Sequence, residues 1–211
     1  MRISKEKAAE NRASLIRAAS KLIRERGIDG VGVAEISKEA GLTHGALYAH
    51  FKSKEELALE ALAFGLDQTA TRMYSATVNG MPDLGAYLDA FLSVEARDDY
   101  ANRCPMAAAA SEIGRQDRAI SSRFTEGYMV MVRAFERQIA DNAPGSDALG
   151  RAMVVVAALI GSIAVARGSA KGNPLVSEQV LAAARTLVDE MMRAPARGAA
   201  DAGPNRGAAA R

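Results

Sequence analysis

Several residue types are scarce in this chain, and each scarcity excludes a class of protein. Tryptophan is absent and aromatic residues make up 5% of the 211 residues, so an aliphatic core is expected. The single cysteine, Cys104, cannot form an intrachain disulfide and fits a reducing cytoplasm. The first residues are charged and lack the apolar run of a secretory signal. We therefore expect a cytoplasmic protein without a disulfide framework.

No stretch of the sequence is expected to cross a membrane. The longest weakly polar run lies between Arg151 and Arg167, and Gly161-Ser162 interrupts it. Its 15 residues are fewer than the roughly 20 that a membrane-spanning helix needs. The sequence therefore predicts no membrane partner.

Motifs for catalysis and metal binding are also missing. The two histidines, His44 and His50, are six residues apart, which places them about 240° apart around a helix. They cannot hold a metal ion as an i, i+4 pair can, and the sequence has no G-x-S-x-G motif, phosphate-binding loop or cysteine cluster. A protein without enzymatic activity, cofactor or metal site is therefore expected.

The composition that is present is ordinary for a folded protein, with 49% apolar and 25% charged residues. The charges are unevenly distributed. Residues 1–56 carry 11 Lys and Arg against 8 Asp and Glu, whereas residues 57–194 carry 13 against 16. A basic first segment on an acidic body indicates contact of that segment with a polyanion such as nucleic acid.

Apolar residues recur with helical spacing along almost the whole chain. A first helix carries a stripe from Leu15 to Ile23 and is expected to end at Gly27. Ser53 and Glu56 form an S-x-x-E capping box that opens a longer helix. Further helices are expected at 83–97, from Cys104-Pro105 onward, and at 117–141, 147–170 and 175–193. With no alternating stretch of useful length for a strand, the predicted fold class is all-α.

Two short segments near the N-terminus have the pattern of a helix-turn-helix. EISKEAG (35–41) and HGALYAHF (44–51) flank a tight turn at 41–43. Leu47 and Phe51 are four residues apart in the second segment and are expected to face inward together. The opposite side of this short helix is therefore expected to face outward.

The outward side carries four residues: Thr43 as the N-cap, His44, Gly45 and Tyr48. The small Gly45 and Ala46 would let the helix enter a major groove about 12 Å wide. Lys54 lies at the start of the next helix, where its charge gains nothing from the helix dipole, so a DNA phosphate is its expected partner. The alternatives are a core Tyr48 with its hydroxyl at the rim, and a His50 that is only a surface residue.

The residues of this region form a long, ordered motif. G-L-T-x-G-x-L-Y-x-H-F-x-S-K-x-x-L spans residues 41–57, and Gly27, Ile36 and Ala40 precede it. With these residues, the segment 11–62 resembles the DNA-binding domain of the TetR family of bacterial transcriptional regulators. The remainder of the chain resembles the family only in its helical architecture.

The resemblance implies roles for individual residues. It implies DNA-backbone contacts at Thr43, Tyr48, His50 and Lys54, and base contacts at His44, Gly45 and Ala46. Where the family usually has Thr or Ser before the second helix, this chain has Val31-Gly32, so a hydroxyl contact to phosphate is lost. Four basic residues near the N-terminus are either a DNA-contacting arm or solvated surface charge: Arg2, Lys5, Lys7 and Arg12.

A single recognition helix reads only a few base pairs, so a dimer on two half-sites is expected. The helices at 147–170 and 175–193 carry apolar stripes for this contact, made of Met153, Val156, Leu159, Ile160 and Ile163, and of Leu181, Ala184, Leu187, Val188 and Met191. Ala157, Gly161 and Ala164 would allow close helix approach across a two-fold axis. The alternative is that both stripes close the chain's own core, and the resemblance favours the dimer.

Between these segments lie methionines and aromatic residues that could line a ligand pocket: Phe64, Tyr74, Tyr87, Phe91, Met106, Phe124, Tyr128 and Met131. Helical spacing of such residues is also typical of plain core, and the pocket is favoured because the resemblance implies one. Cys104 follows Arg103 and opens a helix, so it is either a reactive thiol or a small buried hydrophobe.

The sequence as a whole predicts a homodimeric repressor that binds a palindromic operator through the helix at 44–51. A small, largely apolar effector is expected to release it from double-stranded DNA. The predicted segments are a DNA-binding domain at 1–56, a ligand-binding and dimerisation domain at 57–194, and a disordered tail at 195–211. An architectural DNA-binding protein without a ligand is the alternative.

Overall fold

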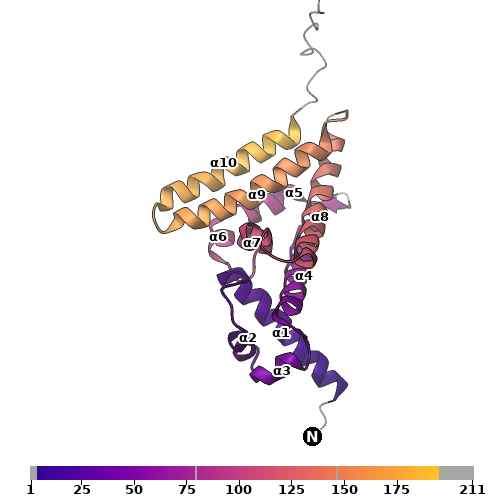
Figure 1. Ribbon diagram of the computed structural model, residues 1–211. Coiled ribbons are helices and arrows are strands. Elements are labelled where there is room, and N and C mark those ends of the chain that lie inside the picture. Colours follow the sequence, from indigo (N-terminus) through magenta and orange to yellow (C-terminus); the bar gives the residue numbers. More distant parts are fainter. Residues whose placement is uncertain (1–3, 79, 146, 195–211) are drawn as a thin grey trace, which may run out of the picture.

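The computed structural model describes residues 4–78, 80–145 and 147–194, which confirm the all-α class (Figure 1). The helices are α1 (Lys5–Arg26), α2 (Val33–Glu39), α3 (His44–Tyr48), α4 (Lys54–Met73), α5 (Leu84–Phe91), α6 (Val94–Asp98), α7 (Pro105–Ile113), α8 (Arg118–Asn142), α9 (Ala148–Ala170) and α10 (Pro174–Arg193). One small antiparallel hairpin, β1 (Thr77–Val78) and β2 (Met81–Pro82), was not expected. The tail predicted at 195–211 and the arm residue Arg2 lie outside the described residues.

The helices form a small head and a larger body. The head consists of α1, α2 and α3 at one end of the molecule, and α9 and α10 lie antiparallel across the opposite end (Figure 1). The helix α4 leaves the head and continues into the body, where it packs on α8. The boundary expected between residues 56 and 57 falls in the first turn of α4 and stays a prediction.

Several predicted helix ends have the expected residues in place. Gly27 ends α1 with a φ of 82°, and its N–H donates to the carbonyl of Ile23 at 2.8 Å. The Ser53 hydroxyl accepts from the N–H of Glu56 at 3.2 Å, as the capping box requires. The carboxylate of Glu56 accepts instead from the N–H of Lys52, at 2.6 Å, so the box is only half formed.

The segment 83–97, predicted as one amphipathic stretch, is two helices. Leu92 leaves the helical conformation and ends α5, and the side chain of Ser93 caps α6. Arg97 lies in the last turn of α6 and is buried. Its guanidinium donates to the hydroxyl of Ser177 in α10 at 3.0 Å, because a buried cation needs hydrogen-bond acceptors.

The helix α9 corrects the length argument made from the sequence. Its 23 residues make it, among the described residues, the one helix long and apolar enough to cross a membrane by length and composition. The length of the apolar segment estimated from the sequence was too short because the estimate ended at the charged residues Arg151 and Arg167. About a third of the apolar window of α9 is buried in the chain, so much of this helix is an exposed apolar surface.

Candidate DNA-binding face, body pocket and dimer face

The short helix α3 is held by two anchors. Leu47 is 0% exposed and Phe51 is 1% exposed, and both belong to the core that includes Leu15 of α1 and Ile36 of α2. The helix has five residues and ends at Tyr48, shorter than the predicted 44–51. The inward orientation of Leu47 and Phe51 is confirmed, and it fixes which side of α3 faces solvent.

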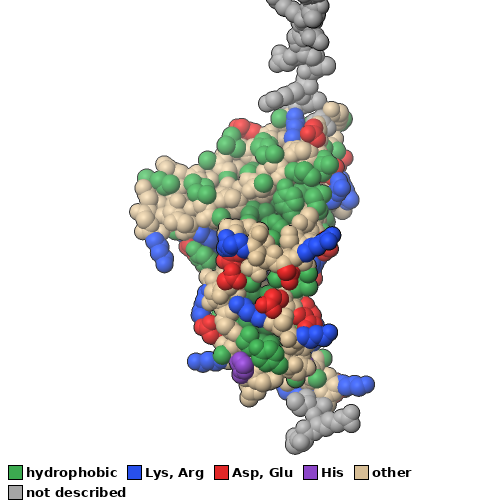
Figure 2. Space-filling view, viewed as in Figure 1, with side chains coloured by type: hydrophobic (Ala, Val, Ile, Leu, Met, Phe, Trp, Pro, Cys, Tyr) green, Lys and Arg blue, Asp and Glu red, His purple; other side chains and the backbone are tan. Residues whose placement is uncertain are grey.

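The opposite side of α3 is open to solvent. Thr43, His44 and Gly45 are exposed, and Tyr48 is 54% exposed. The structure thus contradicts the alternative of a core Tyr48. The rings of His44 and Tyr48 meet edge to face, with centroids 5.6 Å apart. A Cβ added at Gly45 would meet no described atom within 4 Å, so this surface is shallow and accessible (Figure 2).

Three further predicted DNA-binding residues flank this exposed surface. Ala46 and His50 are half-buried beside it. Lys54 is the first residue of α4, is half-buried, and forms no ion pair with any described residue. The side chain of Thr43 does not cap α3, although it occupies the N-cap position. The hydroxyl of Thr43 and the ammonium group of Lys54 therefore both remain available to a phosphate.

The N-terminus of α2 is capped by the chain itself. The Glu35 carboxylate accepts from the N–H of Gly32 at 3.2 Å and from Arg26 at 2.8 Å. These contacts, the Gly32 N–H first, lower the pKa of Glu35 below its ordinary value. The negative charge of this carboxylate lies at the N-terminus of α2, so this end of the helix offers little attraction to phosphate.

Of the described basic residues of the N-terminal arm, Lys7 and Arg12 form ion pairs within the head, whereas Lys5 is exposed and pairs with no described residue. Lys7 pairs with Glu10 at 3.0 Å, one turn further along α1. Arg12 pairs with Glu60 of α4, and its guanidinium lies 4.9 Å from the centre of the Phe51 ring. Arg12 therefore ties α1 to α4, in agreement with a structural rather than a DNA-contacting role.

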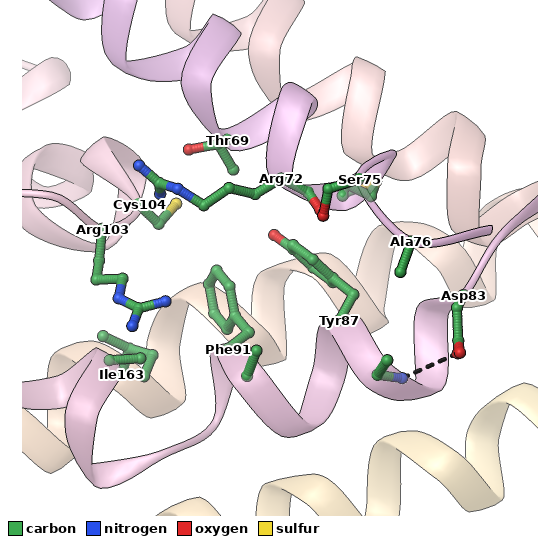
Figure 3. A pocket seen from close by; sticks show the side chains of 14 residues that line it. Thr69, Arg72, Ser75, Ala76, Asp83, Tyr87, Phe91, Arg103, Cys104 and Ile163 are labelled. Atoms are coloured by element: carbon green, nitrogen blue, oxygen red, sulfur yellow. Dashed lines mark hydrogen bonds between the residues drawn. The ribbon is translucent and has the colours of Figure 1, made fainter.

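The body contains a pocket of about 220 Å³ between α4, α5 and the residues around Cys104 (Figure 3). Of the predicted pocket residues, Tyr87 and Phe91 line it. Met106 and Met131 line a smaller adjacent hollow instead. The remaining four lie outside this pocket: Phe64, Tyr74, Phe124 and Tyr128. Phe124 and Tyr128 pack against the core, as the alternative reading of these aromatic residues predicted.

The sequence analysis missed the charged residues of the pocket. Arg72 from the end of α4 and Arg103 from the segment before α7 both line it, as does Asp83, the N-cap of α5. The search for Met and aromatic residues passed over these side chains. These three residues lie on separate segments of the chain, so no regular spacing in the sequence indicates that they share a site.

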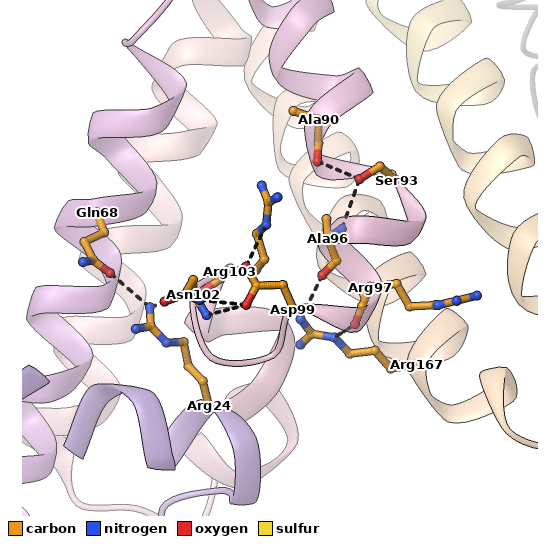
Figure 4. Close-up of polar contacts among 10 residues, drawn as sticks. All are labelled: Arg24, Gln68, Ala90, Ser93, Ala96, Arg97, Asp99, Asn102, Arg103 and Arg167. Carbon is orange, nitrogen blue, oxygen red and sulfur yellow. Dashed lines mark hydrogen bonds and ion pairs between the residues drawn. The ribbon is translucent and has the colours of Figure 1, made fainter. Parts of the chain in front are cut away.

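Further arginines lie around Arg103 and the segment before α7 (Figure 4). Arg24 donates to Gln68 at 3.3 Å and to the carbonyl of Arg103 at 3.4 Å. Arg167 donates to the carbonyls that end α6, at 2.9 and 3.2 Å. Burial, and then the charge of Arg72, lower the pKa of Arg24 to about 10. The lowered pKa shows that the positive charges in this region are partly buried and repel one another.

Cys104 caps α7 and lines the same pocket, where it is 4% exposed. Burial raises the pKa of its thiol, although the N–H groups of Ala107 and Met106 act in the opposite direction. A reactive thiol requires a lowered pKa and access to solvent. The structure therefore favours the alternative of a small buried hydrophobe.

The stripes predicted for dimer contact mostly close the chain's own core. Six of their residues are buried within the chain: Val156, Leu159, Ile160, Ile163, Leu181 and Val188. Ala184 and Met191 are half-buried, and Met153 and Leu187 are exposed. The assignment of the stripes to the interface is wrong for the buried residues, because α9 and α10 pack on each other and on α8 through these side chains.

A different face of the two helices is exposed and apolar; we call it the α9/α10 face. It consists of Met153, Val154, Ala157, Gly161, Ala164, Val165 and Gly168 on α9, and Leu175, Val176, Ala183 and Leu187 on α10. The α9 residues recur every three or four positions, so they form one stripe along the helix. Figure 2 shows apolar side chains gathered over α9 and α10. The three small residues predicted to allow close approach, Ala157, Gly161 and Ala164, belong to this face.

Comparisons with known proteins agree with this arrangement. The model of the tetR family of bacterial regulatory proteins matches residues 15–61, which covers the head and the start of α4. The HTH-type transcriptional regulator TtgR of Pseudomonas putida is 39% identical over 77 residues, or 36% of each chain. An uncharacterized HTH-type transcriptional regulator of Mycobacterium tuberculosis is 28% identical over 171 residues, or 78% of this chain and 88% of that protein.

A solved structure extends the likeness to the body. The TetR transcriptional regulator from Chloroflexus aurantiacus superposes with a TM-score of 0.70, covering 90% of this chain and 98% of the other at 23% identity. This likeness shows the fold, whereas the identity to TtgR concerns about a third of that protein. Residues 15–61 are therefore similar to the tetR family of bacterial regulatory proteins, and the chain shares its helical fold with a solved TetR regulator.

Proposed function

We propose that this chain is a cytoplasmic, homodimeric transcriptional regulator that binds a palindromic operator and is released by a small effector. The observation that carries the proposal is the exposed side of α3, with Tyr48 54% exposed while Leu47 and Phe51 hold the helix in place. Occupation of an operator in the ligand-free state would exclude other proteins from that DNA, so the proposed mode of action is repression.

The helix α4 supports coupling between effector and DNA. It begins at the proposed phosphate contact Lys54 and reaches the pocket with Thr69, Arg72 and Met73. Its 20 residues correspond to about 30 Å of continuous helix. A ligand that favours another position of the pocket end would therefore move the head.

The helix α7 supplies a second connection between pocket and head. Its N-cap, Cys104, lines the pocket, and Glu112 near its other end accepts from the N–H of Ile28 at 2.6 Å. Ile28 follows Gly27 at the end of α1, so this bond joins α7 directly to the head. A shift of α7 would therefore move the head, as a shift of α4 would.

The α9/α10 face supports the homodimer. Its large apolar side chains include Val154 at 55%, Val165 at 54% and Leu175 at 65% exposed. A contiguous apolar surface of this kind favours association, and the same patch on two copies is self-complementary across a two-fold axis. The two heads would then read two half-sites related by symmetry.

Selection of DNA from the source genome tests the proposal. The purified protein is mixed with genomic fragments, and the retained fragments are sequenced. We expect enrichment of one inverted repeat, with affinity lowered about 5- to 150-fold by a coupled effector. Retention without a shared repeat would contradict operator recognition, and affinity unaffected by any pocket ligand would favour the architectural alternative.

Lys54→Ala and Tyr48→Phe are expected to weaken binding to specific and non-specific DNA alike. Each removes a proposed phosphate contact, and the charge lost in Lys54→Ala should lower the slope of log affinity against log salt concentration by about one for each head. The measurement is fluorescence anisotropy on the selected repeat and on a scrambled duplex over a range of salt concentrations.

Lys171→Ala provides the matched control, because Lys171 is an exposed lysine at the C-terminal end of α9. It should leave both affinity and salt slope unchanged. A change of sequence preference in Lys54→Ala or Tyr48→Phe, with non-specific affinity intact, would show that the residue reads bases and not phosphates.

A further inference from the structure

The cationic groups of the body pocket gather at one end. Arg72 and Arg103 lie at the end near Cys104, and the rings of Tyr87 and Phe91 lie beside them, toward Ser75 and Asp83 (Figure 3). Asp83 lies at the other end, where its carboxylate is held by the N–H of Ala86 at 3.0 Å. The pocket is therefore polarised along its length, with cations at one end.

The cations at this end are poorly neutralised. The guanidinium group of Arg72 forms no ion pair or hydrogen bond with any described residue, and the backbone carbonyl of Arg72 accepts from Ser75. Asp99 lies 3.5 Å from Nε of Arg103 but also accepts from Asn102, and this Nε makes no hydrogen bond among the described residues (Figure 4). Burial first, and then the charge of Arg103, lower the pKa of Arg72.

The hydroxyl of Tyr87 is a second, independent sign of a missing partner. Tyr87 is 8% exposed, and its hydroxyl oxygen has no hydrogen-bond partner among the described residues. Nearly all buried polar groups in proteins are hydrogen-bonded, so an unpartnered hydroxyl at a pocket wall indicates a ligand atom. A carboxylate oxygen would accept from this hydroxyl and from the two guanidinium groups.

The remaining wall is mostly apolar and small, and the hydroxyls of its two polar residues, Thr69 and Ser75, donate to backbone carbonyls. Met73, Phe91 and Ile163 line it together with four alanines. A cavity of about 150 Å³ lined by apolar side chains holds a benzene molecule, and this pocket measures about 220 Å³. The available space therefore corresponds to one aromatic ring, or an aliphatic chain of similar volume, together with a carboxylate.

We propose that the body pocket binds a small monocarboxylate whose apolar part has the size of a single aromatic ring. The carboxylate lies between Arg72, Arg103 and the Tyr87 hydroxyl, and the apolar part lies against Phe91 and Ile163. A second anionic group at the far end would meet Asp83, which is why one charge is proposed. This inference rests on the proposed function, since it names the class of effector.

Calorimetry with matched acids and amides tests the proposal. The probes are benzoate, phenylacetate, 4-phenylbutyrate and hexanoate, each compared with its neutral amide on the full chain. At least one acid should bind at least tenfold more tightly than its amide, because charged hydrogen bonds are stronger than neutral ones. Equal affinity of every acid and its amide, or no binding of any acid at millimolar concentration, would overturn the proposal.

Variants separate a binding role from a structural role. Arg72→Met keeps the apolar stem and removes the charge, and Tyr87→Phe removes only the hydroxyl. Both should remove the preference for the acid while the ligand-free protein melts at the same or a higher temperature, because one deletes an unpartnered buried hydroxyl and the other a half-buried guanidinium group without an ion pair. Arg137→Met, at an exposed position on α8, is the control and should change neither quantity. A lower melting temperature with acid preference retained would contradict the assignment.

Operator binding is measured separately in the presence of the tightest acid. An acid that binds but leaves operator affinity unchanged would support the pocket chemistry and contradict the effector role. Conversely, the acid and its amide could release the operator at equal concentrations. That result would support the proposed effector-controlled regulator and contradict the proposal that the pocket recognises a carboxylate. The two proposals therefore fail in different ways.

Discussion

Gly161→Glu is expected to convert the dimer to a monomer and to weaken operator binding on the order of 100-fold. The residue lies in the middle of the exposed α9 stripe, and a Cβ there would meet no described atom within 4 Å. Glutamate is also a better helix former than glycine, by about 0.5–1 kcal/mol. The chain alone therefore tolerates the change, whereas two symmetry-related carboxylates in an apolar interface do not.

Gly114→Glu is the matched control for this prediction. Gly114 is exposed at the C-terminus of α7, has an ordinary helical φ of −63°, and also leaves room for a Cβ. Sedimentation velocity gives the oligomeric state, circular dichroism the melting temperature, and anisotropy the operator affinity. A Gly161→Glu protein that remains dimeric would show that the α9/α10 face is not the interface.

The proposed dimer face illustrates what the sequence could not reveal. Val156 and Ile163 were assigned to an interface because α9 is apolar on more than one side, and helical spacing identifies stripes but not their partners. The structure shows that this stripe packs inside the chain, while Val154 and Val165 are exposed. A helix with two apolar faces needs tertiary contacts to decide which face is free.

The head was predictable for a different reason. In α3 the anchors and the exposed side alternate within a single short helix, so Leu47 and Phe51 alone determined the orientation of Tyr48. The capping residues Ser53 and Gly27 act on neighbouring residues, so they too were recognisable in the sequence. Predictions that depend on contacts within one or two turns were accurate here.

The pocket required long-range structure. Arg72 and Arg103 are 31 positions apart and become neighbours only when α4 and the segment before α7 fold against α5. The aromatic residues Phe124 and Tyr128 have the right chemistry for a pocket, but α8 directs them elsewhere. Residue type alone therefore identified Tyr87 and Phe91 and missed the arginines that define the chemistry of the site.

Gly45→Glu is expected to abolish measurable binding to every duplex, at least 100-fold below the unchanged protein, while the dimer stays intact. Gly45 lies on the exposed side of α3, and a Cβ there meets no described atom within 4 Å. The new carboxylate would face the phosphates of the DNA and block the approach of α3 to the groove. In a dimer the penalty applies at both half-sites.

The same Gly114→Glu control places an equal charge far from α3 and should bind the operator normally. Gly45→Ala completes the comparison, because it adds a methyl group without charge and should change the preferred operator sequence more than the overall affinity. A Gly45→Glu protein that binds DNA with unchanged affinity, while remaining folded and dimeric, would show that another surface contacts DNA. Because Gly161→Glu splits the dimer and Gly45→Glu does not, sedimentation velocity separates loss of DNA binding through the α9/α10 face from loss through α3.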